Sequence, residues 1–216
     1  MELLVKDVSK KIKNKDILID INLELESGNV YGLVGRNGSG KTMLFRALSG
    51  LMKIDSGEIV YNGKVLHKDM KILPNMGIVL ENASLYPELT GLKNLQLLAQ
   101  INFKIDTNQI MEAIERVGLD PKEKRIIKKY SLGMKQRIVL AQAIMEKPDI
   151  LLLDEPTNAL DDNGVELIRN VILEEKRRGA LVIIASHSKE DIHLLADEVY
   201  YMDNGKIIDK VVLDED

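Results

Sequence analysis

The sequence predicts an α/β fold with a mostly parallel sheet, an N-terminal antiparallel β subdomain and an inserted α-helical subdomain. Apolar and polar residues alternate over residues 2–8 and 17–25, which is typical of half-buried antiparallel strands. From residue 148 onward, apolar strand patterns alternate with helical patterns, which indicates parallel strands joined by right-handed crossovers. Helical spacing of apolar residues dominates roughly residues 82–145, so we expect the helical subdomain there.

Length and composition favour a single domain over residues 1–216. The chain is 45% hydrophobic and 30% charged, so it can bury a sizeable core. Its net charge is −4 and its lysines are dispersed, so we expect no nucleic-acid partner. The lack of cysteine excludes disulfides and thiolate metal sites and is compatible with a reducing cytoplasm. No apolar run approaches the roughly 18 residues needed to cross a bilayer, so another chain would have to do so.

Turn-forming residues divide the first part of the chain. Residues 10–16, KKIKNKD, are expected to form a basic turn between the first two strands, with a solvated hairpin as the simplest interpretation. The dipeptide Asn62-Gly63 predicts a hairpin between two short strands. Residues 76–80, MGIVL, predict a further strand, which ends at Glu81.

The helices and later strands follow from spacing and capping residues. Thr90 is expected to cap a first helix of the insert, and a second helix is expected over residues 108–117. Residues 148–157, PDILLLDEPT, contain an apolar run without alternation, as in a strand covered on both faces. The remaining pattern predicts a helix over 163–178, a strand over 180–186, a helix over 189–195 and two final strands.

A glycine-rich motif connects a strand pattern to a helix pattern. Residues 35–42, GRNGSGKT, fit G-x-x-x-x-G-K-[ST] without a mismatch, which predicts a P-loop NTPase core. Backbone N–H groups of such a loop and the following helix N-terminus form a cradle for phosphates. A chance match by a glycine-rich turn is the alternative, and the flanking strand and helix argue against it. We expect the following residues to bind the phosphates, with Thr42 also binding Mg²⁺: Gly35, Arg36, Asn37, Gly38, Ser39, Gly40, Lys41 and Thr42.

Two acidic residues end the buried strand at residues 148–157, where ligands bind in open α/β sheets. Asp154 suits Mg²⁺, held directly or through water, and Glu155 is the better candidate to orient or deprotonate an attacking water. The alternative is an acidic turn before a proline. His187 would lie at the tip of a neighbouring strand and is a further catalytic candidate, with a surface histidine as the alternative.

Together these segments resemble the ATP-binding cassette (ABC) family, the nucleotide-binding subunits of ABC transporters, over almost the whole chain. The resemblance rests on the order and spacing of five segments: GRNGSGKT, YSLGMKQR at 130–137, LLLDEP at 151–156, NALD at 158–161 and ASHS at 185–188. YSLGMKQR is similar to the family signature usually written LSGGQ. It matches the signature at Ser131 and Gly133 and departs from it at Leu132 and Met134.

The resemblance implies a specific assembly. Ser131 is a good N-cap for the helical pattern that follows, so free N–H groups there suit an anion. In similar proteins the signature of one subunit closes over the γ-phosphate held by the partner's loop, and Asp161 is implied at the same nucleotide. The implied protein is an ATP-hydrolysing subunit that uses ATP and Mg²⁺. Its implied partners are a second copy of itself, or a homologous ATPase subunit, and an integral membrane transporter subunit. The implied location is cytoplasmic and peripheral, at the inner face of the cell membrane.

Two positions depart from the family pattern. Ile12 stands where relatives usually carry an aromatic residue stacked on adenine, so we expect phosphates to dominate nucleotide binding and ATP to be weakly preferred over GTP. Glu81 stands where relatives carry glutamine, which resembles a subset of exporters that includes antimicrobial-peptide exporters. We expect Glu81 to act in metal binding, catalysis and coupling to the membrane subunit, with a solvated loop acid as the alternative.

The alternative to a transporter subunit is a soluble ABC-type ATPase that acts in regulation, repair or assembly without transport. DNA-repair and translation factors of this kind add long coiled coils or a second cassette, for which 216 residues leave no room. A regulatory or assembly module of this size is not distinguished from a transporter subunit by the sequence.

Overall fold

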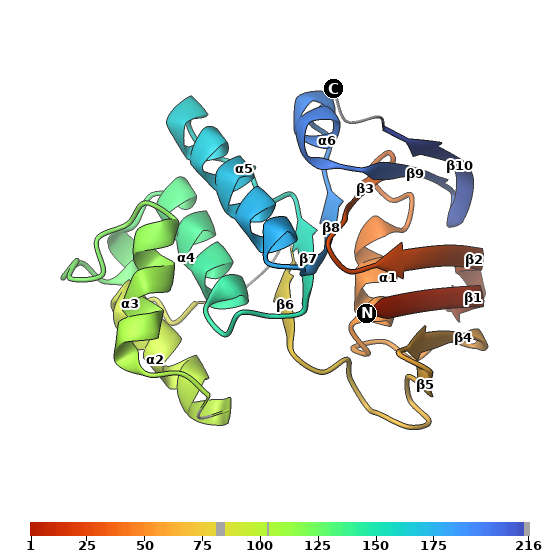
Figure 1. Ribbon diagram of the computed structural model, residues 1–216, viewed down its shortest axis with the longest axis horizontal. Coiled ribbons are helices and arrows are strands. Elements are labelled where there is room, and N and C mark those ends of the chain that lie inside the picture. Colours follow the sequence, from red (N-terminus) through yellow and green to blue (C-terminus); the bar gives the residue numbers. More distant parts are fainter. Residues whose placement is uncertain (81–84, 103, 214–216) are drawn as a thin grey trace.

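The computed structural model describes residues 1–80, 85–102 and 104–213. It contains two sheets and a group of helices to one side (Figure 1). The strands are β1 (Glu2–Ile12), β2 (Lys15–Glu26), β3 (Val30–Val34), β4 (Ser56–Tyr61), β5 (Lys64–Val65), β6 (Met76–Val79), β7 (Ile150–Asp154), β8 (Leu181–Ala185), β9 (Glu198–Asp203) and β10 (Lys206–Val212). The helices are α1 (Lys41–Leu48), α2 (Gly91–Asn102), α3 (Thr107–Arg116), a 3₁₀ turn (Ile127–Lys129), α4 (Leu132–Ile144), α5 (Asp162–Arg177) and α6 (Lys189–Leu195).

The N-terminal sheet is antiparallel, as the alternation predicts, in the order β2-β1-β4-β5. The first two strands run further than expected, because a two-residue turn replaces the basic turn predicted over residues 10–16. Lys13 and Asn14 both have positive φ, at 47° and 63°, the combination that the tightest hairpin turns require. Two of the surrounding lysines form ion pairs, Lys10 with Asp55 and Lys11 with Asp16.

The second sheet has the order β10-β9-β3-β8-β7-β6, and its five strands from β9 to β6 are parallel. The prediction of parallel strands is wrong for β10, which pairs antiparallel with β9. Asn204 and Gly205 connect these two strands, and both have positive φ. Parallel strands need a long crossover, so such a short connection forces an antiparallel pair.

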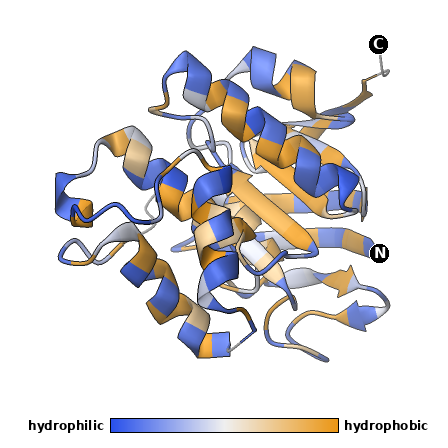
Figure 2. Ribbon diagram, turned by 60° about the vertical axis from the view of Figure 1, so that its left-hand side comes forward, coloured by the Kyte–Doolittle hydropathy of each residue, from blue (hydrophilic) through white to orange (hydrophobic). Residues whose placement is uncertain are grey.

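Alternate residues of the central strands pack into two different hydrophobic cores, one on each face of this sheet. Leu151 and Leu153 of β7 belong to a core shared with α2–α6, whereas Ile150 and Leu152 belong to a core shared with α1 and the antiparallel sheet. All five residues of β7 are buried, as the apolar run predicts. Figure 2 shows the strands at the centre of the molecule largely in the hydrophobic colour, with helices outside them. Because the central strands are packed on both faces, the positions of their carboxyl ends are held by the two cores.

The helical insert lies beside the parallel sheet (Figure 1). Its predicted cap at Thr90 forms, since the backbone N–H of Lys93 donates to the Thr90 hydroxyl. The second helix, α3, starts with a capping box between Asp106 and Gln109, which was not predicted. Helix α4 approaches β6 closely, since a Cβ at Gly77 would lie 2.0 Å from the carbonyl oxygen of Ala143. This contact places the C-terminal end of α4 directly against the strand at the edge of the sheet.

Within the described residues, no helix combines the length and apolarity that crossing a membrane requires.

Candidate functional site

The glycine-rich loop joins β3 to α1, as the motif predicts. A Cβ at Gly35 would lie 2.3 Å from the Met202 carbonyl oxygen, and one at Gly40 would lie 2.7 Å from the Met202 methyl group. Gly35 is therefore required by close packing against the β9 backbone, whereas Gly40 is required by its φ of +114°, which side chains rarely allow. At Gly38, where φ is +79°, a Cβ would have no described neighbour within 4 Å. Gly38 is thus the glycine whose left-handed backbone faces open space, where a phosphate can approach.

Lys41 is the first residue of α1 and is 7% exposed. Its ammonium group donates to the carbonyl oxygens of Gly35, at 2.7 Å, and Arg36, at 3.3 Å. Burial lowers the pKa of Lys41, while the carboxylates of Glu155 and Asp154 oppose this change. A cation is therefore held over the loop, beside two carboxylates that come from the end of β7.

The Thr42 hydroxyl donates to a carboxylate oxygen of Asp154 at 2.7 Å. Asp154 is the last residue of β7 and is 4% exposed. Mg²⁺ prefers oxygen ligands at 2.0–2.1 Å, which places neighbouring ligands of an octahedron about 2.9 Å apart. The pair fits Mg²⁺ in both chemistry and spacing, with the remaining positions left for phosphate and water. Thr42 and Asp154 are thus the residues that would hold the metal.

Glu155 and His187 lie together next to this pair. The imidazole Nε2 of His187 is 3.4 Å from Oε1 of Glu155, and the His187 backbone N–H donates to Oε2, also at 3.4 Å. Burial raises the pKa of the Glu155 carboxyl above its usual value, whereas His187 opposes this change. A carboxylate with a raised pKa is better suited to accept a proton near neutral pH. The two strand tips, β7 and β8, bring these residues together because they are adjacent and parallel.

These groups line one cavity of about 840 Å³ between the loop and the strand ends. Several residues that line this cavity were not predicted from the sequence, and most of them come from the start of β2 and the β9–β10 turn. These residues are Lys15, Asp16, Ile17, Asn204 and Gly205, together with Asn158 near β7. The dipeptide Asn204-Gly205 is a hairpin signal that could have revealed the turn, but no local pattern shows that it packs against the glycine-rich loop.

Ile12 is 38% exposed at the end of β1, where it pairs with Lys15 across the hairpin. It is not among the residues that line the cavity, whereas Ile17 is. The apolar side chains that line the cavity are therefore Ile17 of β2 and Met43 of α1. Weak discrimination between ATP and GTP stays a prediction. Glu81, also expected at the site, lies outside the described residues.

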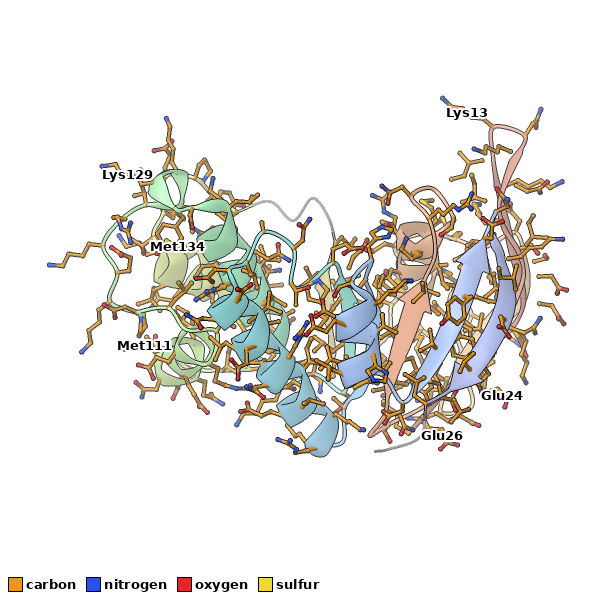
Figure 3. The ribbon with its side chains drawn as sticks, turned by 90° about the horizontal axis from the view of Figure 1, so that it is seen from above. Lys13, Glu24, Glu26, Met111, Lys129 and Met134 are labelled. Carbon is orange, nitrogen blue, oxygen red and sulfur yellow. The ribbon has the colours of Figure 1, made fainter. Side chains whose placement is uncertain are left out.

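Ser131 caps α4, as predicted, since its hydroxyl accepts from the Met134 backbone N–H at 3.1 Å. Neither Ser131 nor Gly133 lines the cavity described above. Figure 3 shows Met134 on the opposite side of the molecule from Lys13 at the hairpin turn. Gly133 has a second reason to be glycine, because a Cβ there would lie 2.9 Å from the Ala159 carbonyl oxygen. The signature segment thus packs against residues that follow Glu155.

Asp161 also lies apart from the cavity. Its carboxylate accepts from the backbone N–H of Gly164 at the start of α5 and from Arg137 of α4 at 2.9 Å. The Asp161 side chain remains 72% exposed. The structure therefore separates the predicted site residues into two groups. One group surrounds the glycine-rich loop, and the other, formed by Ser131, Gly133 and Asp161, lies outside the loop's own cavity.

Comparison with known proteins agrees with this arrangement. The sequence profile of the family described as "ABC transporter" matches residues 18–158. The ABC transporter ATP-binding protein YybJ of Bacillus subtilis (strain 168) is 47% identical over 98% of both chains. The bacitracin transport ATP-binding protein BcrA of Bacillus licheniformis is 37% identical over 96% of this chain and 69% of its own length. The lantibiotic transport ATP-binding protein SrtF of Streptococcus pyogenes is 33% identical over 95% of this chain and 89% of its own length.

Two solved structures share the fold. One is a dimeric ATP-binding cassette in a post-hydrolysis state, bound to ADP and phosphate, with a TM-score of 0.88, 22% identity, and coverage of 99% of this chain and 100% of that chain. The other is an ATP-binding subunit of an ABC transporter, with a TM-score of 0.88, 25% identity, and coverage of 99% and 91%. The predicted α/β fold class is confirmed by these neighbours. Given the profile match and the relatives, the chain belongs to the ABC transporter family as an ATP-binding subunit with ATPase activity.

Proposed function

We propose that two copies of the chain, or one copy and a homologous subunit, close over two ATP molecules and drive transport through a separate membrane subunit. The observation that carries this proposal is the separation of Ser131 from the cavity of its own chain. Leu132, the next residue, is 69% exposed, so this face of α4 is open to another molecule. The relation to a dimeric cassette of the same fold supports the arrangement.

The residues around the cavity have separate roles in this proposal. Lys41 and the loop N–H groups bind the outer phosphates, and Thr42 and Asp154 hold Mg²⁺. When bound, the metal neutralises charge that develops on the phosphate oxygens. Glu155 orients the attacking water and accepts its proton, since it lies beside the metal-binding pair and has a raised pKa. His187 holds the Glu155 carboxylate through two contacts.

Ser131 and Gly133 of the facing subunit complete the site on the γ-phosphate side, and Asp161 lies at the same interface. The N-terminal end of α4, which Ser131 caps, provides N–H groups and a favourable dipole for an anion. We propose that Glu81 links the γ-phosphate site to the membrane subunit, as its place in the sequence, between β6 and the helical insert, suggests. Residues 1–216 act as one ATP-binding domain, which includes the helical insert at roughly 82–145.

The transported compounds belong to the class of antimicrobial peptides. This part of the proposal rests on BcrA and SrtF, whose names assign them to bacitracin and lantibiotic transport. The membrane subunit would place the chain at the cytoplasmic face of the cell membrane.

A coexpression experiment tests the transport role. We expect the chain to sediment with membranes only when a multispanning protein encoded beside it is coexpressed, and to confer resistance to a bacitracin- or lantibiotic-type peptide. The Lys41→Ala variant is the matched control, because it keeps the membrane contact but loses phosphate binding, so it should sediment without conferring resistance. If the chain stays in the supernatant and the membrane protein does not change its ATPase rate, the soluble ATPase alternative is correct.

A further inference from the structure

The backbone of Glu155 has a conformation that residues other than glycine rarely adopt. Its φ is +51°, in the left-handed region. A residue in such a conformation keeps it only when the surrounding structure holds it there, and these residues gather at functional sites. The direction of the Glu155 side chain therefore depends on the groups that hold its backbone.

Several hydrogen bonds hold this backbone. The Glu155 N–H donates to the Ala185 carbonyl oxygen of β8 at 2.8 Å, and the Asn158 N–H donates to the Glu155 carbonyl oxygen at 3.2 Å. The side-chain amide of Gln136 donates to the same Glu155 oxygen at 3.2 Å and to the carbonyl oxygen of Pro156 at 3.4 Å. The first two contacts come from the sheet and from the local turn, whereas Gln136 comes from the helical insert.

Gln136 is well placed for this role. It is half-buried on α4, the helix that Ser131 caps, one turn and a residue after that cap. Its Nε2 carries two N–H groups, so one amide can satisfy two carbonyl oxygens on successive residues. The next residue, Arg137, forms an ion pair with Asp161 at 2.9 Å, so two neighbouring side chains of α4 hold the segment that follows β7.

We propose that Gln136 is a positioning residue for the ATPase reaction, which holds the peptide units around Glu155 so that its carboxylate faces the cavity. Helix α4 thereby carries the signature cap at its start and fixes the reacting carboxylate one turn later. A change in the position of the insert is transmitted through the Gln136 amide to Glu155. This inference rests on the role proposed above for Glu155.

The first test is Gln136→Met, which keeps the length of the side chain and removes its donor. We expect kcat for ATP hydrolysis to fall by roughly tenfold to a hundredfold, because small displacements of reacting groups have effects of this size. KM for MgATP should stay close to its original value, since Gln136 does not line the nucleotide cavity. Gln142→Met, at another half-buried glutamine of the same helix, is the matched control and should keep its kcat.

The second test separates positioning from a structural effect. In a Glu155→Gln background, measured by single-turnover hydrolysis, adding Gln136→Met should cause little further loss, because the carboxylate it positions is already absent. An equal fractional loss in both backgrounds, or an unchanged kcat in Gln136→Met, would overturn the inference. If Gln136→Met does not fold, Gln136→Glu provides the same comparison with a side chain of similar shape that places an acceptor against the two carbonyls. Retention of full turnover by Glu155→Gln alone would instead contradict the proposed role of Glu155.

Discussion

Replacing Glu155 with glutamine is expected to leave MgATP binding intact and to slow ATP turnover by roughly 10²- to 10⁴-fold, the range over which a positioned general base contributes. The loss corresponds to about 3–5.5 kcal/mol of transition-state stabilisation, at about 1.4 kcal/mol per tenfold change. Glutamine keeps the shape of the side chain but accepts no proton from water. The groups that bind phosphate and metal, Lys41, Thr42 and Asp154, are unchanged by this substitution, so nucleotide affinity should persist.

Steady-state ATPase kinetics and equilibrium binding of MgATP measure the two parts of this prediction. Glu166→Gln is the matched control, because Glu166 is an exposed glutamate on α5 away from the cavity. Wild-type kcat in the Glu155→Gln variant would show that another group accepts the proton. Loss of MgATP binding in the same variant would show that Glu155 contributes to nucleotide affinity.

The second large effect is expected at Ser131. Ser131→Arg should prevent the MgATP-dependent dimer while leaving nucleotide binding by the separate subunits intact, because the exposed arginine would occupy the space of the facing phosphate. Each lost hydroxyl–phosphate bond is worth about 1.5–3 kcal/mol, since it is charge-assisted. The substitution also removes the N-cap of α4, which costs about 1 kcal/mol. That cost is small beside a typical folding stability of roughly 5–15 kcal/mol, so the variant should remain folded.

Sedimentation in the Glu155→Gln background measures this effect, because slow hydrolysis preserves the ATP-bound dimer. Ser131→Asp separates the two functions of the serine. Aspartate keeps the cap but places a negative charge against the phosphate, so it should also abolish the dimer. Dimers that persist in Ser131→Asp but not in Ser131→Arg would assign Ser131 to steric fit alone, and dimers in both variants would remove it from the interface.

The sequence predicts the parts of the site whose chemistry is local. The glycine-rich loop, the acids at the end of β7 and the cap at Ser131 each follow from a short pattern, and the structure places them as those patterns require. The meeting of Glu155 and His187 also follows, because both lie at the carboxyl ends of apolar strands that prove to be neighbours.

Features that depend on packing between distant segments could not be predicted in this way. The contribution of Ile17 and Asn204 to the cavity requires knowing that β2 and the β9–β10 turn meet the glycine-rich loop. The close packing that requires Gly35 depends on the contact between the loop and the β9 backbone. The contact between Gln136 and the Glu155 carbonyl depends on how the insert lies against the sheet, which no local pattern determines.

Mixing two inactive variants tests the central claim most directly, namely that the site of one copy is completed by the other. Lys41→Ala lacks a working phosphate loop but keeps its signature segment, whereas Ser131→Asp has the opposite defect. A mixed dimer contains one site with both parts intact, so the mixture should hydrolyse ATP faster than the sum of the separate preparations, with a maximum at equal concentrations. Activity equal to that sum at every ratio would contradict the account, because it would mean that each chain hydrolyses ATP with its own residues alone.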